Sequence, residues 1–143
     1  MPVATVDADL ARLAGSIDRL LGWHRRNTPP GGHSLTARSV LARLDVEGPS
    51  RISDLARAEG VTQPAMTGLV NRLEAEDKVR READPTDARA ALVSLTADGR
   101  QFVRARRAER AAVLAAALER LPAPDQEALL AAGPALDRLA SSG

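Results

Sequence analysis

Apolar residues recur at helical spacing along most of the chain, with one extended interruption. The first predicted helix covers residues 6–24, because its apolar positions fall three or four residues apart. These positions are Val6, Leu10, Leu13, Ile17, Leu20 and Leu21. The Pro-Pro-Gly-Gly run at residues 29–32 removes backbone donors and favours turns, so it ends this helix and predicts a loop.

A second helix is predicted to follow this loop. Either Ser34 or Thr36 is suited to cap its first turn, and Gly48 is suited to stop it. Its inward-facing positions are Val40, Leu41 and Leu44.

Two further short helices follow in quick succession. The stretch RISDLARAEG predicts a helix with Ser53 as its N-cap and Gly60 as its terminating residue. The stretch VTQPAMTGLVNRLEAED predicts another, in which Thr62 caps the first turn and Pro64 is tolerated because it lies in that turn. Two short helices joined by a tight turn containing glycine, here Gly60-Val61, are typical of a helix-turn-helix.

Residues 79–96, VRREADPTDARAALVSLT, are extended rather than helical in pattern. The stretch breaks at Asp84-Pro85, a turn-forming pair, and resumes as an apolar alternation. It therefore predicts a hairpin. Thr96 then caps a long predicted helix, and a proline pair separates that helix from a last one over residues 124–140.

The second helix of the predicted helix-turn-helix has two distinct faces. Its apolar face carries Met66, Leu69, Val70 and Leu73. We expect its outer face to contact DNA through Thr62, Gln63, Pro64, Thr67, Gly68, Asn71 and Arg72. No acid occurs between Thr62 and Leu73, although acids flank that stretch on both sides. A helix in the major groove needs this, since carboxylates are repelled by phosphates while Gln, Asn and Arg pair with base edges. A merely solvated amphipathic helix is the alternative for this helix alone.

An exposed hairpin directly after such a helix is typical of a wing. Wings reach along the duplex, and an arginine near the tip can enter the narrow, negative minor groove. Arg89 is the candidate for this contact, and we expect Asp87 to orient it by a charge-assisted hydrogen bond. Arg80 and Arg81 are expected nearer the phosphates. An ordinary surface loop is the alternative for Asp87-Ala88-Arg89 taken alone.

The amino-acid composition excludes several kinds of functional site. The absence of cysteine excludes disulfides, thiolate metal sites and thiol-based redox sensing. Trp23 and Phe102 are the only aromatic residues, so a stacking platform for single-stranded nucleic acid is not expected. The net charge of +1 is no strong nucleic-acid signal by itself. The first ten residues do not resemble a signal peptide and no apolar stretch is long enough to span a bilayer, so we expect a cytoplasmic protein with no membrane partner.

At this point the sequence resembles the MarR family of winged-helix transcriptional regulators, closely over residues 35–101 and by helix layout elsewhere. The stretches that carry the resemblance are RISDLARAEGVTQPAMTGLVNRLEAED and VRREADPTDARAALVSLTADGR. The acidic-x-Arg tip, the VSLT strand end and the following DGR look like the family's wing and the start of its fifth helix. The resemblance implies a mainly α fold with a small β-hairpin wing, in which a winged helix-turn-helix is joined to a helical dimerisation lobe.

The resemblance also implies a homodimer that reads a palindromic site in double-stranded DNA, usually as a repressor. It divides the chain into an N-terminal dimerisation helix and loop (1–33), a DNA-binding lobe (34–97) and C-terminal dimerisation helices (98–143). The apolar stripes of the terminal helices support a dimer independently, because such long helices cannot all be covered by one small lobe. We expect dimer contacts at Leu10, Leu13, Ile17, Leu118, Leu121, Leu129 and Leu136.

Two departures from the family's pattern bear on DNA reading. The family commonly has Gly-Leu between recognition helix and wing, whereas this chain has Asp77-Lys78; Asp can adopt the left-handed conformation, and Lys78 could reach phosphate. Gly68 stands in mid-helix, where the family often has a larger polar or basic side chain, and glycine there costs about 1 kcal/mol of helix stability. Thr36 and Arg38 are further expected contacts to the DNA backbone.

Many proteins of this family release DNA when a small, often aromatic and anionic, compound binds between the dimer and DNA lobes. The matching residues here are Trp23, His24, Arg26, His33 and Phe102, with Arg38 nearby. An aromatic ring and several cations suit a carboxylate or phenolate. The alternative is that the aromatic residues belong to the core or a hinge and the arginines are solvated. Two isolated histidines nine residues apart do not predict a metal site, and no cofactor is expected.

An enzyme is not expected, because the sequence has no glycine-rich phosphate loop, no metal-ligand cluster and nothing that positions a catalytic triad. The more serious alternative is a winged-helix module that docks protein partners without binding an operator. The near-neutral charge and Gly68 favour that module, whereas the acid-free outer face and Arg89 favour DNA.

Overall fold

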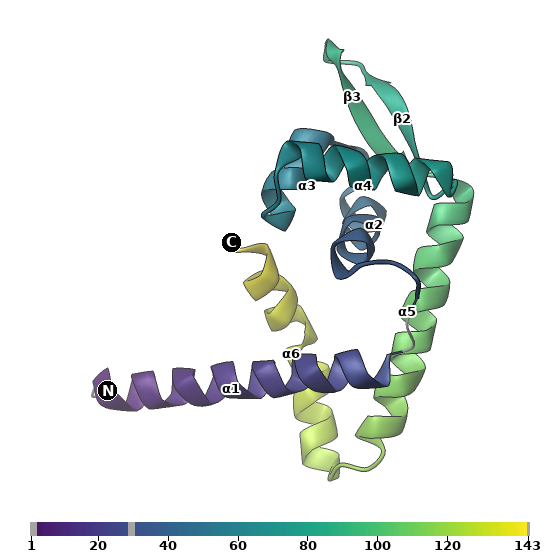
Figure 1. Ribbon diagram of the computed structural model, residues 1–143. Helices are drawn as coiled ribbons and strands as arrows, with labels where there is room; N and C mark the ends of the chain where they lie inside the picture. Colours follow the sequence, from purple (N-terminus) through teal and green to yellow (C-terminus); the bar gives the residue numbers. More distant parts are fainter. Residues whose placement is uncertain (1–2, 29–30, 143) are drawn as a thin grey trace. The chain divides into compact units, whose positions relative to one another are not determined.

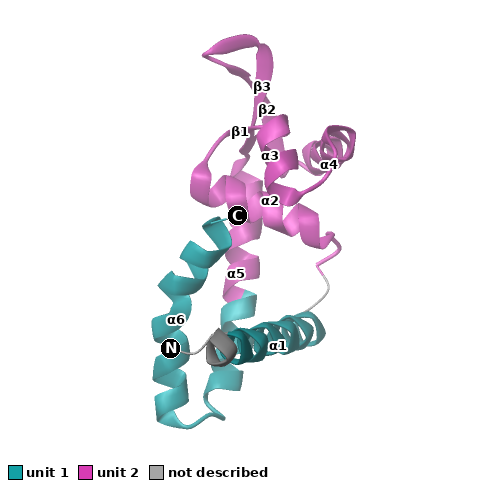
Figure 2. Ribbon diagram, turned by 90° about the vertical axis from the view of Figure 1, so that its left-hand side faces the viewer, with its two compact units in different colours: residues 1–29, 109–143 teal, residues 30–108 magenta. Residues whose placement is uncertain are grey.

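The computed structural model describes residues 3–28 and 31–142. In chain order its elements are α1 (Val3–Asn27), α2 (Leu35–Glu47), β1 (Ser50–Arg51), α3 (Ile52–Glu59), α4 (Gln63–Ala75), β2 (Val79–Asp84), β3 (Asp87–Leu95), α5 (Ala97–Leu118) and α6 (Ala123–Ser141). They form two compact units, one of residues 1–29 with 109–143 and the other of residues 30–108 (Figures 1 and 2). None of the helices in the described ranges is both long and apolar enough to cross a membrane.

The unit of residues 30–108 is a winged helix with one apolar core. Helices α2, α3 and α4, strands β2 and β3, and the beginning of α5 all bury side chains in it. The predicted apolar face of α4 is confirmed, because Met66, Leu69, Val70 and Leu73 are all buried. Val103 is buried in the same core and Phe102 packs against it. This packing places the start of α5 in the winged unit, which therefore extends past the expected boundary at residue 97.

The predicted hairpin is part of a three-stranded antiparallel sheet in the order β1-β3-β2. Strands β2 and β3 pair from Val79 opposite Leu95 towards the tip, and the register shifts between Ala83 and Asp84. In Figure 1 the hairpin projects away from α3 and α4, as a wing does. Strand β1, which pairs with β3, was not predicted, because two residues are too few for a periodic pattern.

Helices α3 and α4 form the predicted helix-turn-helix. Gly60 ends α3 in the left-handed conformation, with φ of 64° and ψ of 31°. The Thr62 hydroxyl caps α4 by accepting the Ala65 amide at 3.3 Å. The prediction that Ser53 caps α3 was wrong: the helix begins at Ile52, because β1 runs directly into it, and no side chain caps it.

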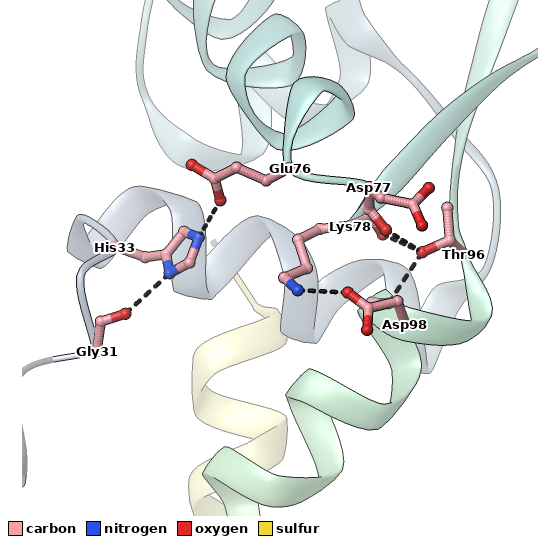
Figure 3. A network of polar contacts seen from close by, with 8 residues as sticks. Gly31, His33, Glu76, Asp77, Lys78, Thr96 and Asp98 are labelled. Atoms are coloured by element: carbon pink, nitrogen blue, oxygen red, sulfur yellow. Dashed lines mark hydrogen bonds and ion pairs between the residues drawn. The ribbon is translucent and has the colours of Figure 1, made fainter.

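The turn between α4 and β2 is closed by the start of α5 (Figure 3). Asp77 has φ of 56°, the left-handed conformation predicted for it. The Thr96 amide and hydroxyl both donate to the Lys78 carbonyl, at 3.1 and 3.3 Å. The same hydroxyl accepts the Gly99 amide at 2.9 Å, which confirms Thr96 as the cap of α5. The base of the wing is thus joined to the start of α5 by hydrogen bonds from the Thr96 amide and hydroxyl.

The other unit contains α1, the end of α5, and α6. Among its described side chains, α6 has none that is buried. Large apolar side chains are exposed on all three helices, namely Leu10, Leu13, Leu20, Leu21, Leu114, Leu129, Leu130, Leu136 and Leu139. Pro134 lies inside α6.

Candidate nucleic-acid interface

The outer face of α4 is polar and open to solvent. Gln63, Pro64, Asn71 and Arg72 are exposed, and Thr67 and Gly68 are half-buried. The face exists because the four core positions of α4 point the opposite way. It has no acid before the last turn of the helix. Every residue predicted for the outer face therefore lies on it or at its cap.

Two of these side chains already have partners within the protein. The Thr67 hydroxyl donates to the Gln63 carbonyl at 3.0 Å, as is common for threonine inside a helix. The Asn71 Oδ1 accepts a hydrogen bond from Arg81 at 2.6 Å. By contrast, the guanidinium of Arg72 has no hydrogen-bond or ion-pair partner among the described residues.

The wing tip is built around a buried carboxylate, Asp84. It accepts the Thr86 hydroxyl at 2.7 Å and the Thr86 amide at 2.8 Å, which closes the turn over Pro85. Arg51 of β1 donates to it through Nε at 2.7 Å. The hydrogen bonds from Thr86, and then the hydrogen bond and charge of Arg51, lower the pKa of Asp84 to about 2. From the sequence we did not predict that Thr86 and Arg51 hold the Asp84 carboxylate. The Asp-Pro-Thr spacing does indicate the turn that Thr86 closes. No nearby residue in the sequence indicates the contact with Arg51.

Asp87 contacts Arg89, but differently from the prediction. Its Oδ1 accepts the Arg89 main-chain amide at 3.0 Å, so it holds the backbone of the tip and not the guanidinium. The reason is geometric, because an aspartate readily reaches an amide two residues onward. Within the described part of the chain, the exposed guanidinium of Arg89 has no hydrogen-bond or ion-pair partner.

Three other cations predicted to contact phosphates, Lys78, Arg80 and Arg81, are held in ion pairs. Arg81 is paired with Glu74 of α4. Lys78 is paired with Asp98, as Figure 3 shows. Arg80 lies 2.6 Å from Glu82.

These three pairs differ in exposure. The side chains of Lys78 and Arg81 are half-buried, whereas that of Arg80 is 62% exposed. An exposed pair contributes little stability, so Arg80 can exchange its partner for phosphate at low cost. The glutamate paired with it has a lowered pKa because of a hydrogen bond from Ser94 and then because of Arg80.

Thr36 and Arg38 lie in the first turns of α2, as half-buried residues. Ser34 is the cap of this helix, because its hydroxyl accepts the Ala37 amide at 3.1 Å. The Nε atom of Arg38 is buried without a hydrogen-bond partner among the described residues.

The five residues predicted for an effector pocket belong to two units. Trp23, His24 and Arg26 lie on α1, whereas His33 and Phe102 lie in the winged unit. The latter two are in contact, with ring centroids 4.9 Å apart.

Both ring nitrogens of His33 are engaged in the winged unit, one with the Gly31 carbonyl at 3.0 Å and one with Glu76 at 2.5 Å (Figure 3). These contacts engage both hydrogen-bonding atoms of the His33 side chain. A separate depression of the winged unit is lined by Arg80, Glu82, Arg100 and others, but by none of the five predicted residues. The described residues include no group of three or more His, Cys, Asp or Glu arranged to hold a metal.

The residues predicted for dimer contacts are mostly open to solvent. Leu10, Leu13, Leu121, Leu129 and Leu136 are exposed, and Ile17 and Leu118 are half-buried. A row of exposed leucines is uncommon on a monomer and is typical of a surface that another chain covers.

Comparison with known proteins decides the family. A model of the MarR family matches residues 34–91. The HTH-type transcriptional regulator MT0903.1 of Mycobacterium tuberculosis is 34% identical over 131 residues, which cover 89% of this chain and 91% of that protein. The chain belongs to the MarR family. It is therefore a DNA-binding transcriptional regulator with a winged helix-turn-helix.

Two other similar proteins are also transcriptional regulators. A crystal structure of a candidate transcriptional regulator from Pseudomonas aeruginosa superposes with a TM-score of 0.83 at 28% identity, covering 99% of both chains. The HTH-type transcriptional repressor NicR of Pseudomonas putida is 38% identical over 60 residues, which cover 42% of this chain and 38% of that protein.

Proposed function

We propose that this chain binds a palindromic operator in double-stranded DNA as a homodimer, with α4 in the major groove and the wing in the minor groove. The observation that carries the proposal is the free guanidinium of Arg89 on a wing whose tip is fixed by internal hydrogen bonds. A wing with a loose tip would have to be ordered on binding, at a cost in entropy. Asp84 and Asp87 fix the tip in advance, so Arg89 is presented to the narrow minor groove.

The outer face of α4 supports the same mode of binding. Gln63 and Arg72 are exposed and can donate to base edges, and Thr62 and Thr67 lie beside them for backbone contacts. The half-buried Gly68 leaves no side chain in the middle of the face, which lets the helix backbone approach the DNA closely.

The exposed leucines of α1, α5 and α6 support the homodimer. A two-fold axis through these helices would cover them and place two copies of α4 one DNA turn apart, about 34–36 Å, or a multiple of that distance. Repression is the mode we propose for the regulator, supported by the name of NicR. Release by a small aromatic or anionic compound at Trp23, His24, Arg26, His33 and Phe102 stays a prediction.

The test is operator binding at several salt concentrations. DNA from upstream of the protein's own gene is compared with scrambled DNA by fluorescence anisotropy, using the wild type, Arg89→Ala and the control Arg104→Ala. Arg104 is an exposed arginine of α5, so its loss changes the net charge equally. We expect Arg89→Ala to lower affinity on the order of tenfold and to reduce the salt slope by about 1, while the control stays at wild-type affinity.

Two results would contradict the proposal. If Arg89→Ala binds the operator with wild-type affinity, Arg89 of the wing does not contribute to DNA binding. Equal, weak binding of the wild type to both DNAs, repeated in a genome-wide binding selection, would favour the alternative of a winged-helix module that docks proteins.

A further inference from the structure

One arginine of the wing, Arg81, is bound to two side chains of the recognition helix α4. Arg81 of β2 is ion-paired through Nη1 with Glu74, and its Nη2 donates to the Asn71 Oδ1 at 2.6 Å. Glu74 and Asn71 lie three residues apart on α4, so they share one side of the helix and both face the strand. The side chain of Arg81 is only 28% exposed. It is therefore held in one position by a charge and a charge-assisted hydrogen bond.

The hydrogen bond from Arg81 determines the orientation of the Asn71 side-chain amide. A guanidinium has five donors and no acceptor, so the atom of Asn71 that faces it must be the oxygen. The Nδ2 group is then the end directed away from Arg81, and Asn71 as a whole is exposed on the outer face of α4.

This orientation changes what asparagine can read. A free asparagine reads adenine with two bonds, because Oδ1 accepts from N6 and Nδ2 donates to N7. When Arg81 donates to Oδ1, it engages one of the two lone pairs of that oxygen and fixes the amide with its Nδ2 donor directed away from Arg81. The guanidinium beside it also repels the amino groups of adenine and cytosine. Guanine presents two acceptors, O6 and N7, and is the base edge that suits this arrangement.

We propose that Arg81 is a positioning residue that sets base specificity: it fixes the Asn71 amide so that its Nδ2 donor is presented to the groove and its oxygen lies beside a cation, and Asn71 then selects guanine over adenine in each half-site. The inference rests on the proposed function, in which α4 reads the major groove. It gives Arg81 a role other than the phosphate contact that the sequence predicts.

The experiment is a binding-site selection from a DNA library with randomised half-sites, using the wild type, Asn71→Ala, Arg81→Met and the control Arg80→Met. Arg80 is the adjacent cation of β2 and is paired with Glu82, away from Asn71. Asn71→Ala identifies the position that Asn71 reads, because preference is lost at that position alone. Thermal unfolding of each variant confirms that it is folded.

We expect the wild type to favour guanine over adenine at that position on the order of tenfold. Arg81→Met frees the Asn71 oxygen, so the preference should move to adenine there while other positions are unchanged. Arg80→Met should lower affinity for every sequence alike and keep the wild-type base preference, because a phosphate contact carries no sequence information. Arg81→Ala provides a second variant with the same expectation, should the methionine pack in a new place.

Three results overturn the inference. The first is a wild-type preference for adenine at the position that Asn71 reads. The second is an unchanged preference in both Arg81 variants. The third is a uniform loss of affinity without a change of base, which would make Arg81 a phosphate contact. Failure of the proposed function looks different, because the wild type itself would then select no sequence, and the inference would fall with it.

Discussion

Two glycines inside helices of the winged unit predict opposite responses to the same substitution. Gly68 lies in the middle of α4, and a Cβ added there meets no heavy atom within 4 Å beyond the adjoining helix backbone. Gly99 lies in the first turn of α5, and a Cβ added there would be 2.0 Å from the carbonyl oxygen of Lys78 and 3.2 Å from a methyl of Leu95. The first site has room for a methyl group and the second has none.

The magnitudes follow from these surroundings. Gly68→Ala should raise the free energy of unfolding by about 0.5–1 kcal/mol, because the unfolded chain loses freedom and the helix gains no clash. For a chain of this size that corresponds to about 3 °C in Tm. Gly99→Ala must displace a carbonyl that accepts two hydrogen bonds from Thr96. Overpacking of this kind costs about 1–3 kcal/mol, or about 4–12 °C in Tm.

The assay is thermal unfolding followed by circular dichroism, at one protein concentration because the Tm of a dimer depends on it. A lower Tm for Gly68→Ala, or a wild-type Tm for Gly99→Ala, would refute the prediction that the room for a Cβ at each glycine decides the change in stability. The stable Gly68→Ala protein also tests the proposed approach of the α4 backbone to DNA. Weaker operator binding by this variant would support close approach, and unchanged binding would exclude it.

Two further predictions concern the dimer and acid stability. Leu129→Asp combined with Leu136→Asp should lower the mass measured by multi-angle light scattering from about twice 15.1 kDa to that of one chain. The control Val46→Asp, at an exposed position of α2, should remain a dimer. An unchanged mass of the double variant would contradict a dimer interface on α6. The pKa of Asp84 is about 2 against an ordinary 3.8, so its stabilising contribution is present above about pH 4 and is lost as the pH falls through about 2. Urea unfolding across this pH window should show that loss in the wild type and less of it in Asp84→Asn; equal acid dependence in both would contradict this assignment.

The helices of the winged unit were predictable because apolar periodicity reports burial. The spacing of Met66 and Leu73 placed the inner face of α4, and Gly60 and Thr62 placed its turn and cap. Strand β1 was not predictable in this way. Its pairing with β3 joins Ser50 to a residue far along the chain, and two residues carry no period. The start of α3 was misplaced for the same reason, since the strand determines where that helix begins.

The sequence predicted which kinds of residue lie at the site, but not which residues they contact. Sequence places cations on the wing because their positions follow the helix-turn-helix, but it does not say which acids lie beside them. Arg81 and Glu74 are near in sequence yet meet only because β2 folds back along α4. Asp87 was expected to hold the Arg89 side chain and instead holds its amide, a difference that depends on the turn geometry.

These pairings also explain why a net charge of +1 does not weigh against DNA binding. The acids of the winged unit neutralise the cations that hold the wing in place, as Glu74 does for Arg81 and Asp98 does for Lys78. Arg72 on the outer face of α4 and Arg89 on the wing, by contrast, have no ion-pair or hydrogen-bond partner for their guanidinium groups among the described residues. Phosphates respond to the local field within about a Debye length, roughly 8–10 Å, and not to the sum over the chain. A near-neutral protein can therefore present a cationic face, provided that its acids are engaged elsewhere.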